Sequence, residues 1–437
     1  MHQDNLRATV LNNFESMSIY SVVFKNEPGR TIHQLLSNLT RPDGELRNRK
    51  LAAQLFEELV TRAENTHLPL VGSLWQNFIL DQVISVENTF TRMAAGGRLA
   101  LNEPPAKAVK SAAAADLRVL KHLLDLDLSA VFPFPNPYLG LLNQGGEKIV
   151  PAPPAGGPQW EIYNLKKALI STPDWSETVE LLAEFHQRCG YGLFCLHHAL
   201  RWDGKNKKLT GIPDPDPVRL EHLVGYDRER GQVIENTERL LAGLPAGNML
   251  LYGDRGTGKS STVKALVHQY GGRGLRMVEL SKAFLGDFQE VLAALKGATL
   301  KFIIFVDDLS FEEHETEYKQ FKSILDGSLQ ASPENVAIYA TSNRRHLLRE
   351  YFEERRQEVH GSDTLQEKLS LSDRFGITVL FLSPDQDLYL EIVEGLARQK
   401  GIDMPADELR LRALDWERWH NSRSGRTARQ FVDYLLS

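Results

Sequence analysis

The short segment at residues 253–260 constrains this chain more than any other feature. It reads Gly-Asp-Arg-Gly-Thr-Gly-Lys-Ser and fits the pattern G-x-x-x-x-G-K-S, which is typical of a loop that holds phosphate groups. The apolar run at 248–252 precedes it and indicates a buried strand, and a stretch of helical character at 261–270 follows it. A chance glycine-rich turn is the alternative, but the position between a strand and a helix favours a phosphate-binding loop.

Each part of this loop has a chemical role. Gly253, Gly256 and Gly258 allow the backbone to approach a phosphate closely, and the N–H groups at the start of the helix face the anion. Lys259 is expected to reach the β- and γ-phosphates, and the hydroxyl of Ser260 to ligate Mg²⁺. We therefore predict a nucleotide site that uses the whole segment: Gly253, Asp254, Arg255, Gly256, Thr257, Gly258, Lys259, Ser260 and Ser261.

A second apolar run, at residues 302–306, ends in the pair Asp307-Asp308. In proteins with a phosphate-binding loop, the acid associated with Mg²⁺ follows such a strand. We expect Asp307 to belong to the coordination shell of the metal, through water, and Asp308 to polarise the attacking water. An ordinary acidic turn is the alternative, and the phosphate loop upstream makes it the weaker interpretation.

The chain of 437 residues is long enough for two or three domains. Residues 1–130 show mostly helical spacing of apolar side chains, and 131–217 combine proline-rich connections with one helix. We expect that helix to take Thr172 as its N-cap, to have Pro173 in its first position and to stop at Gly190.

From residue 218 to 384 the pattern alternates between strands and helices, which favours a parallel sheet covered by helices. Residues 385–437 read as helices only and predict a small helical lid. The strand candidates are 248–252, 276–280, 302–306, 336–340 and 377–381.

The composition limits the possible partners. The formal net charge is −6, so no global basic field favours nucleic acid or an anionic membrane. No apolar run is long enough to span a bilayer, and the N-terminus lacks the features of a secretory signal. Cys189 and Cys195 fit no common zinc spacing, and we expect buried or idle thiols in a cytoplasmic protein.

Further motifs in residues 218–437 follow in an order that resembles the AAA+ ATPases. The segment 223–226, Leu-Val-Gly-Tyr, resembles the part that contacts adenine, and 339–343, Tyr-Ala-Thr-Ser-Asn, resembles the sensor-1 strand. Leu-Ser-Asp-Arg-Phe at 371–375 resembles the segment that carries the arginine finger. Ser-Gly-Arg-Thr-Ala-Arg at 424–429 resembles the sensor-2 helix of the lid.

This resemblance implies an α/β fold of the P-loop NTPase type, with a five-stranded parallel sheet, a small helical lid and a mainly helical N-terminal region. It implies ATP and Mg²⁺ as ligands. It adds four expectations for the site: Gly225 and Tyr226 near adenine, Asn343 near the γ-phosphate, Arg374 as the finger, and Arg426 as sensor 2 with Arg429 in reserve.

The segments 253–261, 307–312 and 340–347 are more narrowly similar to a stand-alone bacterial AAA+ family of ATP-binding proteins of unknown function. One feature departs from most active AAA+ members, which carry Asp-Glu where this chain has Asp307-Asp308. Aspartate is shorter, and a misplacement of about 1 Å can lower a rate by roughly a hundredfold. Asp308 then acts from a shifted backbone, or Glu312 or Glu313 assists, or hydrolysis is slow.

The resemblance implies an ATPase that couples ATP binding and hydrolysis to the remodelling or loading of an unidentified macromolecule. An arginine finger acts on a neighbouring subunit, which implies a homo-oligomer, either a ring or an open helix. Two alternatives remain: an ATP-dependent switch or adaptor that hydrolyses weakly, favoured by Asp307-Asp308, and a DNA-associated loader, disfavoured by the acidic net charge.

Overall fold

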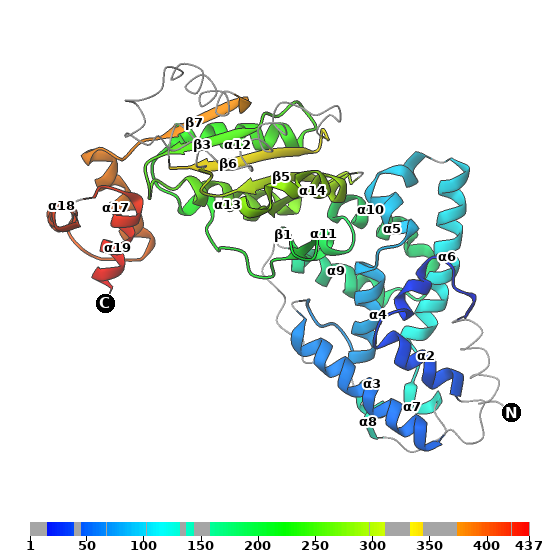
Figure 1. The fold of residues 1–437 in the computed structure, drawn as a ribbon. Helices are drawn as coiled ribbons and strands as arrows, with labels where there is room; N and C mark the ends of the chain where they lie inside the picture. Colours follow the sequence, from blue (N-terminus) through cyan, green and yellow to red (C-terminus); the bar gives the residue numbers. More distant parts are fainter. Residues whose placement is uncertain are drawn as a thin grey trace. The chain divides into compact units, whose positions relative to one another are not determined.

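The computed structural model describes residues 15–38, 45–66, 68–101, 103–131, 137–143, 158–296, 298–310, 333–343, 374–420 and 422–436. The chain divides into two compact units, one made of residues 1–197 with 297–300 and the other of 198–296 with 301–437. The first is helical and the second is built on a sheet, as the ribbon shows (Figure 1).

The first unit is a set of helices around one apolar core, so the expected helical N-terminal region is confirmed. Trp75 and Phe78 of α4 and Trp175 lie at its centre, almost entirely buried. The helices are α2 (Gly29–Asn38), α3 (Glu45–Asn65), α4 (Leu74–Ser85), α5 (Thr89–Ala95), α6 (Pro104–Leu124), α7 (Leu128–Val131), α8 (Pro137–Asn143), α9 (Pro158–Ser171), α10 (Val179–Cys189) and α11 (Leu193–Leu196).

Two polar groups organise the interior of this unit. The carboxylate of Asp116 accepts hydrogen bonds from the backbone N–H groups of Ser18, Ile19 and Tyr20 and so anchors the segment before α2. The ammonium of Lys166, fully buried, lies 2.5 Å from Asp81 and donates to the carbonyl of Pro69 at 2.7 Å. These partners compensate for the cost of burying charged groups.

The helix expected to begin at Thr172 begins later. Thr172 follows α9, and the 3₁₀ turn η3 (Trp175–Thr178) separates it from α10. Asp174 accepts a hydrogen bond from the backbone N–H of Ser176 at 2.8 Å, and the indole N–H of Trp175 donates to the carbonyl of Leu169. This turn holds the chain until Val179. The expected stop at Gly190 is correct, with φ +83° there.

The second unit contains a seven-stranded sheet with the order β2-β1-β4-β5-β6-β3-β7. All five predicted strands are present and lie parallel to their neighbours: β3 (Met249–Gly253), β4 (Leu275–Glu279), β5 (Lys301–Val306), β6 (Val336–Ser342) and β7 (Ile377–Phe381). The α/β class and the parallel core of the sheet are therefore confirmed.

Two strands that were not predicted extend the sheet. β1 (Ala199–Asp203) pairs parallel with β4, and β2 (Lys208–Gly211) pairs antiparallel with β1. The turn between them is built on Asp203, whose carboxylate accepts from the backbone N–H groups of Lys205 and Asn206. The indole N–H of Trp202 donates to Asp287 at 2.9 Å and fixes β1 on its neighbour's loop.

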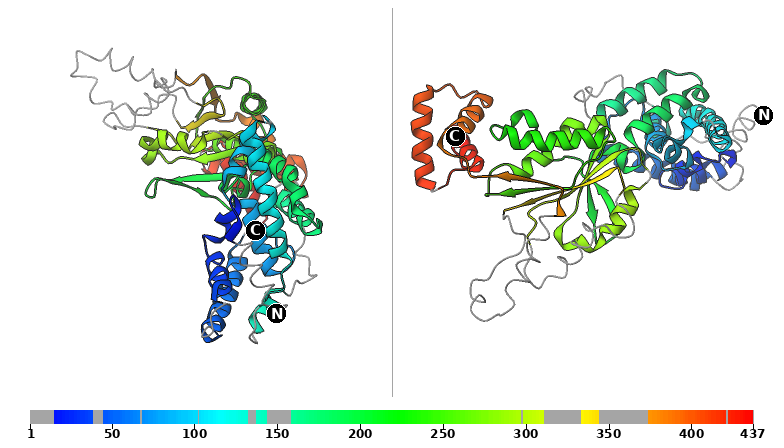
Figure 2. Two further views of the ribbon diagram at one scale, coloured as in Figure 1. Left: turned by 90° about the vertical axis from the view of Figure 1, so that its right-hand side faces the viewer. Right: turned by 90° about the horizontal axis from the view of Figure 1, so that it is seen from above.

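The helices α12 (Asp227–Leu241) and α13 (Lys259–Tyr270) contribute Val233, Leu240, Val263 and Leu266 to the core on one face of this sheet. Figure 2 shows the helices beside the sheet in two further views. The helix α14 (Phe288–Leu295) follows β4 in the chain.

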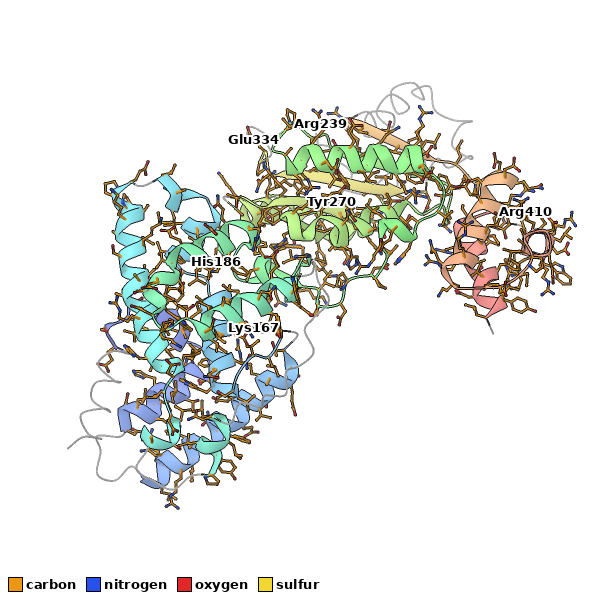
Figure 3. All side chains as sticks on the ribbon, turned by 180° about the vertical axis from the view of Figure 1, so that it is seen from behind. Lys167, His186, Arg239, Tyr270, Glu334 and Arg410 are labelled. Carbon is orange, nitrogen blue, oxygen red and sulfur yellow. The ribbon has the colours of Figure 1, made fainter. Side chains whose placement is uncertain are left out.

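The small helical lid is also confirmed. The helices α17 (Gln386–Gln399), α18 (Ala406–His420) and α19 (Gly425–Leu435) enclose a core of their own around Tyr389, Ile392 and Phe431. Arg410 of α18, labelled in Figure 3, pairs with Glu394 of α17 at 2.5 Å.

Candidate nucleotide-binding site

The predicted phosphate loop connects β3 to α13, and two of its glycines are required by the backbone. Gly253 has φ +134°, and a Cβ there would lie 1.9 Å from the carbonyl oxygen of Phe381 in β7. Gly258 precedes α13 with φ +91°, in the left-handed region that glycine adopts at little cost. The N–H groups at the start of α13 are thus presented by a loop that only glycine can form.

The side chain of Lys259 lies over this loop. Its ammonium donates to the carbonyl of Gly253 at 3.0 Å and of Asp254 at 2.6 Å, and the residue is only 6% exposed. Burial lowers the pKa of Lys259, while the negative charges of Asp254, Asp308 and Asp307 oppose that shift. A cation is therefore held where a phosphate chain would contact the loop.

Oxygen donors gather on one side of the loop. The hydroxyl of Ser260 donates to Oδ1 of Asp307 at 2.6 Å, and the hydroxyl of Thr341 donates to the same oxygen at 2.5 Å. Mg²⁺ is typically bound by one or two carboxylates together with phosphate oxygens. The donor set of Ser260 and Asp307 therefore fits the expected ion.

Asp308 has an unusual backbone. Its φ is +50°, in the left-handed region, which costs on the order of 1 kcal/mol for a residue with a side chain. Its N–H donates to the hydroxyl of Thr341 at 3.0 Å, and its Oδ1 accepts from the amide of Asn343 at 2.7 Å. Because β5 and β6 are adjacent and parallel, the residues that follow them meet at one edge of the sheet.

A pocket of about 370 Å³ adjoins the loop, within the range of ligand sites. Gly225 lies between Val224 and Tyr226, which both line the pocket. Its φ is +74°, and a Cβ there would lie 2.6 Å from Cδ1 of Leu388. The hydroxyl of Tyr226 donates to the carbonyl of Leu382 at 2.7 Å. The lining comprises His222, Leu223, Val224, Tyr226, Gly256, Thr257, Gly258, Ser261, Ile392, Leu396, Gly425, Arg426 and Arg429.

The structure thus brings most of the predicted residues together around the loop. Both sensor-2 candidates, Arg426 and Arg429, line the pocket, so the choice between them stays open. Arg255 is exposed at the tip of the loop. Glu312 and Glu313 lie outside the described residues.

Arg374 is not part of this cluster. It precedes β7, whose first residue, Ile377, pairs with Met249, whereas the phosphate loop follows the other end of β3. The two ends are separated by the length of the strand, roughly 13 Å at about 3.3 Å per residue.

Three residues of the site were not predicted. Thr341 and Lys264 contact Asp307, the latter at 4.0 Å, and Ser383 donates to Asp254 from both its N–H and its hydroxyl. The hydroxyl of Ser383 is the main cause of a lowered pKa of Asp254. Lys264 follows Ser260 by one helical turn, which was a signal in the sequence; the contact of Ser383 depends on the pairing of β7 with β3.

A phosphate loop after β3, an acidic pair after the parallel strand β5 and a helical lid beside the loop define an ATPase-type protein of the AAA+ class. A family model described as "Protein of unknown function (DUF815)" matches residues 196–437, and the chain belongs to that family.

Solved structures of RuvB from Thermotoga maritima are similar to this chain. The one described as a Holliday junction branch migration motor is 15% identical, covering 50% of this chain and 72% of that one, with a TM-score of 0.32. A RuvB variant is 14% identical over the same shares, with a TM-score of 0.33. Similarity of this extent carries no conclusion about substrate or partner. No curated protein matches the chain.

Two further findings concern the described part of the chain. None of its helices combines the length and the apolar character that a membrane crossing requires. Cys189 and Cys195 are buried and are not joined in a disulfide, and within the described ranges no three His, Cys, Asp or Glu side chains are grouped to hold a metal ion.

Proposed function

We propose that this protein binds ATP with Mg²⁺ and hydrolyses it, and that it couples the cycle to the remodelling or loading of a macromolecule. The observation that supports this most is the pair of contacts beside the loop. Ser260 meets Asp307 at 2.6 Å, and Asn343 meets Asp308 at 2.7 Å. Phosphoryl transfer to water needs residues that hold Mg²⁺ and residues that orient the attacking water, both next to the phosphate loop. The first contact would serve the metal and the second the water.

The residues divide the work. Lys259 neutralises charge on the β- and γ-phosphates, and the backbone N–H groups of 256–260 hold their oxygens. Ser260 and Asp307 hold Mg²⁺, which when bound reduces the repulsion between phosphate oxygens. Asn343 orients Asp308, and Asp308 accepts a hydrogen bond from the attacking water.

Arg374 is proposed to act on the γ-phosphate of a neighbouring subunit. Its position before β7, at the opposite end of the strands from its own loop, supports a role in trans. A guanidinium there stabilises the charge of the transition state in the adjacent site. The active form is then a homo-oligomer, and its location in the cytoplasm remains a prediction.

A switch that binds ATP and hydrolyses it weakly is the second candidate, and Asp308 favours it. The short side chain of Asp308 is already engaged by Asn343, and its backbone is held with φ +50° by Thr341. Held in this way, the carboxylate of Asp308 would lie too far from a water that attacks a γ-phosphate bound at the loop.

Turnover and binding measured side by side separate these functions. The parent protein is titrated with a fluorescent ATP analogue, and phosphate release is followed with and without Mg²⁺. Sustained release that requires Mg²⁺ and is lost in Asp308→Asn supports the ATPase. Tight binding with no release above the Asp308→Asn background favours the switch, and no binding contradicts both.

A further inference from the structure

A second cavity lies beside the nucleotide site, on the face of the sheet that α13 covers. It is a cavity of about 250 Å³ that opens to solvent, smaller than the usual range for drug-sized ligands. Its floor is a row of residues in register across three parallel strands: Arg201 of β1, Glu279 of β4 and Phe305 of β5. Lys264 and Val267 of α13, the helix that ends at Tyr270 in Figure 3, complete the wall above this row.

The lining combines an apolar body with charges of both signs. Val267, Met277 and Phe305 supply the apolar surface. Arg201 and Glu279 pair with each other at 2.7 Å. Lys264 lines the same cavity as Asp214 and Asp216, two exposed acids of the segment that passes over α13, where the carbonyl of Asp216 contacts His268 at 2.7 Å.

This pattern selects one kind of ligand chemistry. A simple anion would be attracted by Lys264 but repelled by Asp214 and Asp216. A simple cation would be attracted by the two acids but repelled by Lys264. A zwitterion satisfies both charges, and the small volume limits its apolar part. The matching class is a free α-amino acid with an apolar side chain, whose carboxylate faces Lys264 and whose ammonium faces the acids.

Lys264 connects this cavity to the metal side of the nucleotide site. β5 ends at Val306, and Asp307 follows it directly, two residues after Phe305 of the cavity floor. The ammonium of Lys264 lies 4.0 Å from Oδ2 of Asp307. Its positive charge disfavours a divalent cation there, and a ligand carboxylate next to it would offset that charge.

We propose that this cavity binds a free L-α-amino acid with an apolar side chain, and that the bound amino acid strengthens the binding of Mg²⁺·nucleotide through Lys264. The coupling rests on the proposed function, whereas the site itself does not. Linkage requires the reciprocal effect, so that Mg²⁺·nucleotide tightens the binding of the amino acid by the same factor.

Calorimetric titration of the full chain without nucleotide tests the site. L-leucine is the probe, with 4-methylpentanoate as the carboxylate alone and isopentylamine as the ammonium alone. L-leucine is expected to bind, and each single-charge analogue to bind about tenfold more weakly, because one charge-assisted contact is lost. The same loss is expected for L-leucine in Lys264→Met and in Asp214→Asn, whereas Lys205→Met, an exposed lysine of the β1–β2 turn, should bind like the parent.

The site is wrong if L-leucine, L-methionine and L-phenylalanine all fail to bind, if 4-methylpentanoate binds as tightly as L-leucine, or if Lys264→Met binds like the parent. Circular dichroism establishes that each variant is folded. If Lys264→Met does not fold, Asp214→Asn decides, because Asp214 is exposed in a connecting segment.

The coupling is measured as the affinity for a fluorescent ATP analogue with Mg²⁺, with and without saturating L-leucine. An increase of about fivefold is expected, a typical size for coupling between two sites. An unchanged affinity overturns the coupling and leaves the site standing. A chain that binds L-leucine but no nucleotide overturns the proposed function instead.

Discussion

The amide of Asn343 donates a hydrogen bond of 2.7 Å to the carboxylate of Asp308. The two residues follow adjacent parallel strands, β6 and β5, and are 35 positions apart in the chain. Their contact places a neutral donor against the acid that we propose to face the attacking water. It also fixes one oxygen of a side chain that is shorter than the glutamate found in most active AAA+ members.

Lys259→Ala is expected to abolish ATP binding or to weaken it severely. The substitution removes the cation that lies over the loop, and with it the proposed contacts to the β- and γ-phosphates. Titration with a fluorescent ATP analogue measures the effect, with Lys205→Ala as a control at an exposed lysine. Unchanged binding by Lys259→Ala would contradict the assignment of the loop.

Asp308→Asn should leave nucleotide affinity nearly intact and lower turnover, because the residue is proposed to orient water. Asp307→Asn should weaken Mg²⁺-dependent binding as well, since Asp307 meets Ser260. Equal effects of the two changes on binding would contradict this division of roles. Asp308→Glu is the complement: faster phosphate release would show that the short side chain limits the rate.

Arg374→Ala should retain ATP affinity but lose turnover, because its guanidinium is proposed to act across an interface. Mixing it with Lys259→Ala, which keeps its own Arg374, should restore part of the activity in mixed assemblies. Light scattering gives the oligomeric state, and the rescue should disappear where the protein is a monomer. A monomeric parent that is fully active would rule out the mechanism in trans.

Thr341→Val should lower both turnover and stability. The hydroxyl of Thr341 donates to Asp307 and accepts from the N–H of Asp308, and its loss removes two part-buried hydrogen bonds, each worth about 0.5–1.5 kcal/mol. Urea unfolding measures the stability. Thr341→Ser keeps the hydroxyl and should recover most of the turnover; if it remains as inactive as Thr341→Val, the hydroxyl is not the reason.

The stability of the first unit should fall as the pH drops from about 6.5 to about 4. His186, labelled in Figure 3, is buried among Phe90 and Phe185, and burial lowers its pKa from 6.5 to about 4. In that pH range the unfolded chain binds a proton at His186 and the folded chain does not. The free energy of unfolding that neutral His186 contributes above pH 6.5 is therefore lost as the pH falls. The shift corresponds to roughly 3 kcal/mol.

His186→Leu should reduce this acid sensitivity, measured as the urea midpoint between pH 7 and pH 4.5. The exposed His122 of α6 provides the control, because His122→Leu should keep the parental pH dependence. An identical pH dependence in the parent and His186→Leu would show that other groups cause the acid loss.

The sequence was most informative where one local pattern decides the structure. The five predicted strands are short apolar runs, and the loop needs glycine at fixed positions, so both were predictable. β1 was not, because the Pro-rich segment after it suggested a linker, whereas its pairing with β4 depends on contacts from Trp202 to Asp287. The start at Thr172 failed for a similar reason: Asp174 forms a competing turn with Ser176.

Within the site, residue types at the ends of strands were predictable because parallel strands bring their ends to one edge. The bond between Ser383 and Asp254 was not, since it requires the pairing of β7 with β3, and the sequence does not state which strands are neighbours. The φ of +50° at Asp308 was equally hidden, because aspartate adopts the left-handed region at only some positions, and here the N–H of Asp308 bonds to Thr341 of the neighbouring strand.

The absence of a side chain at Gly256 has a consequence for the lid. A Cβ at Gly256 would lie 3.0 Å from Ser424, the N-cap of α19, and a Cβ at Gly425 would lie 3.0 Å from the carbonyl oxygen of Gly256. The phosphate loop and the first turn of α19 are therefore in direct backbone proximity. We therefore expect that a change in the conformation of the loop would act first on the N-terminal turn of α19.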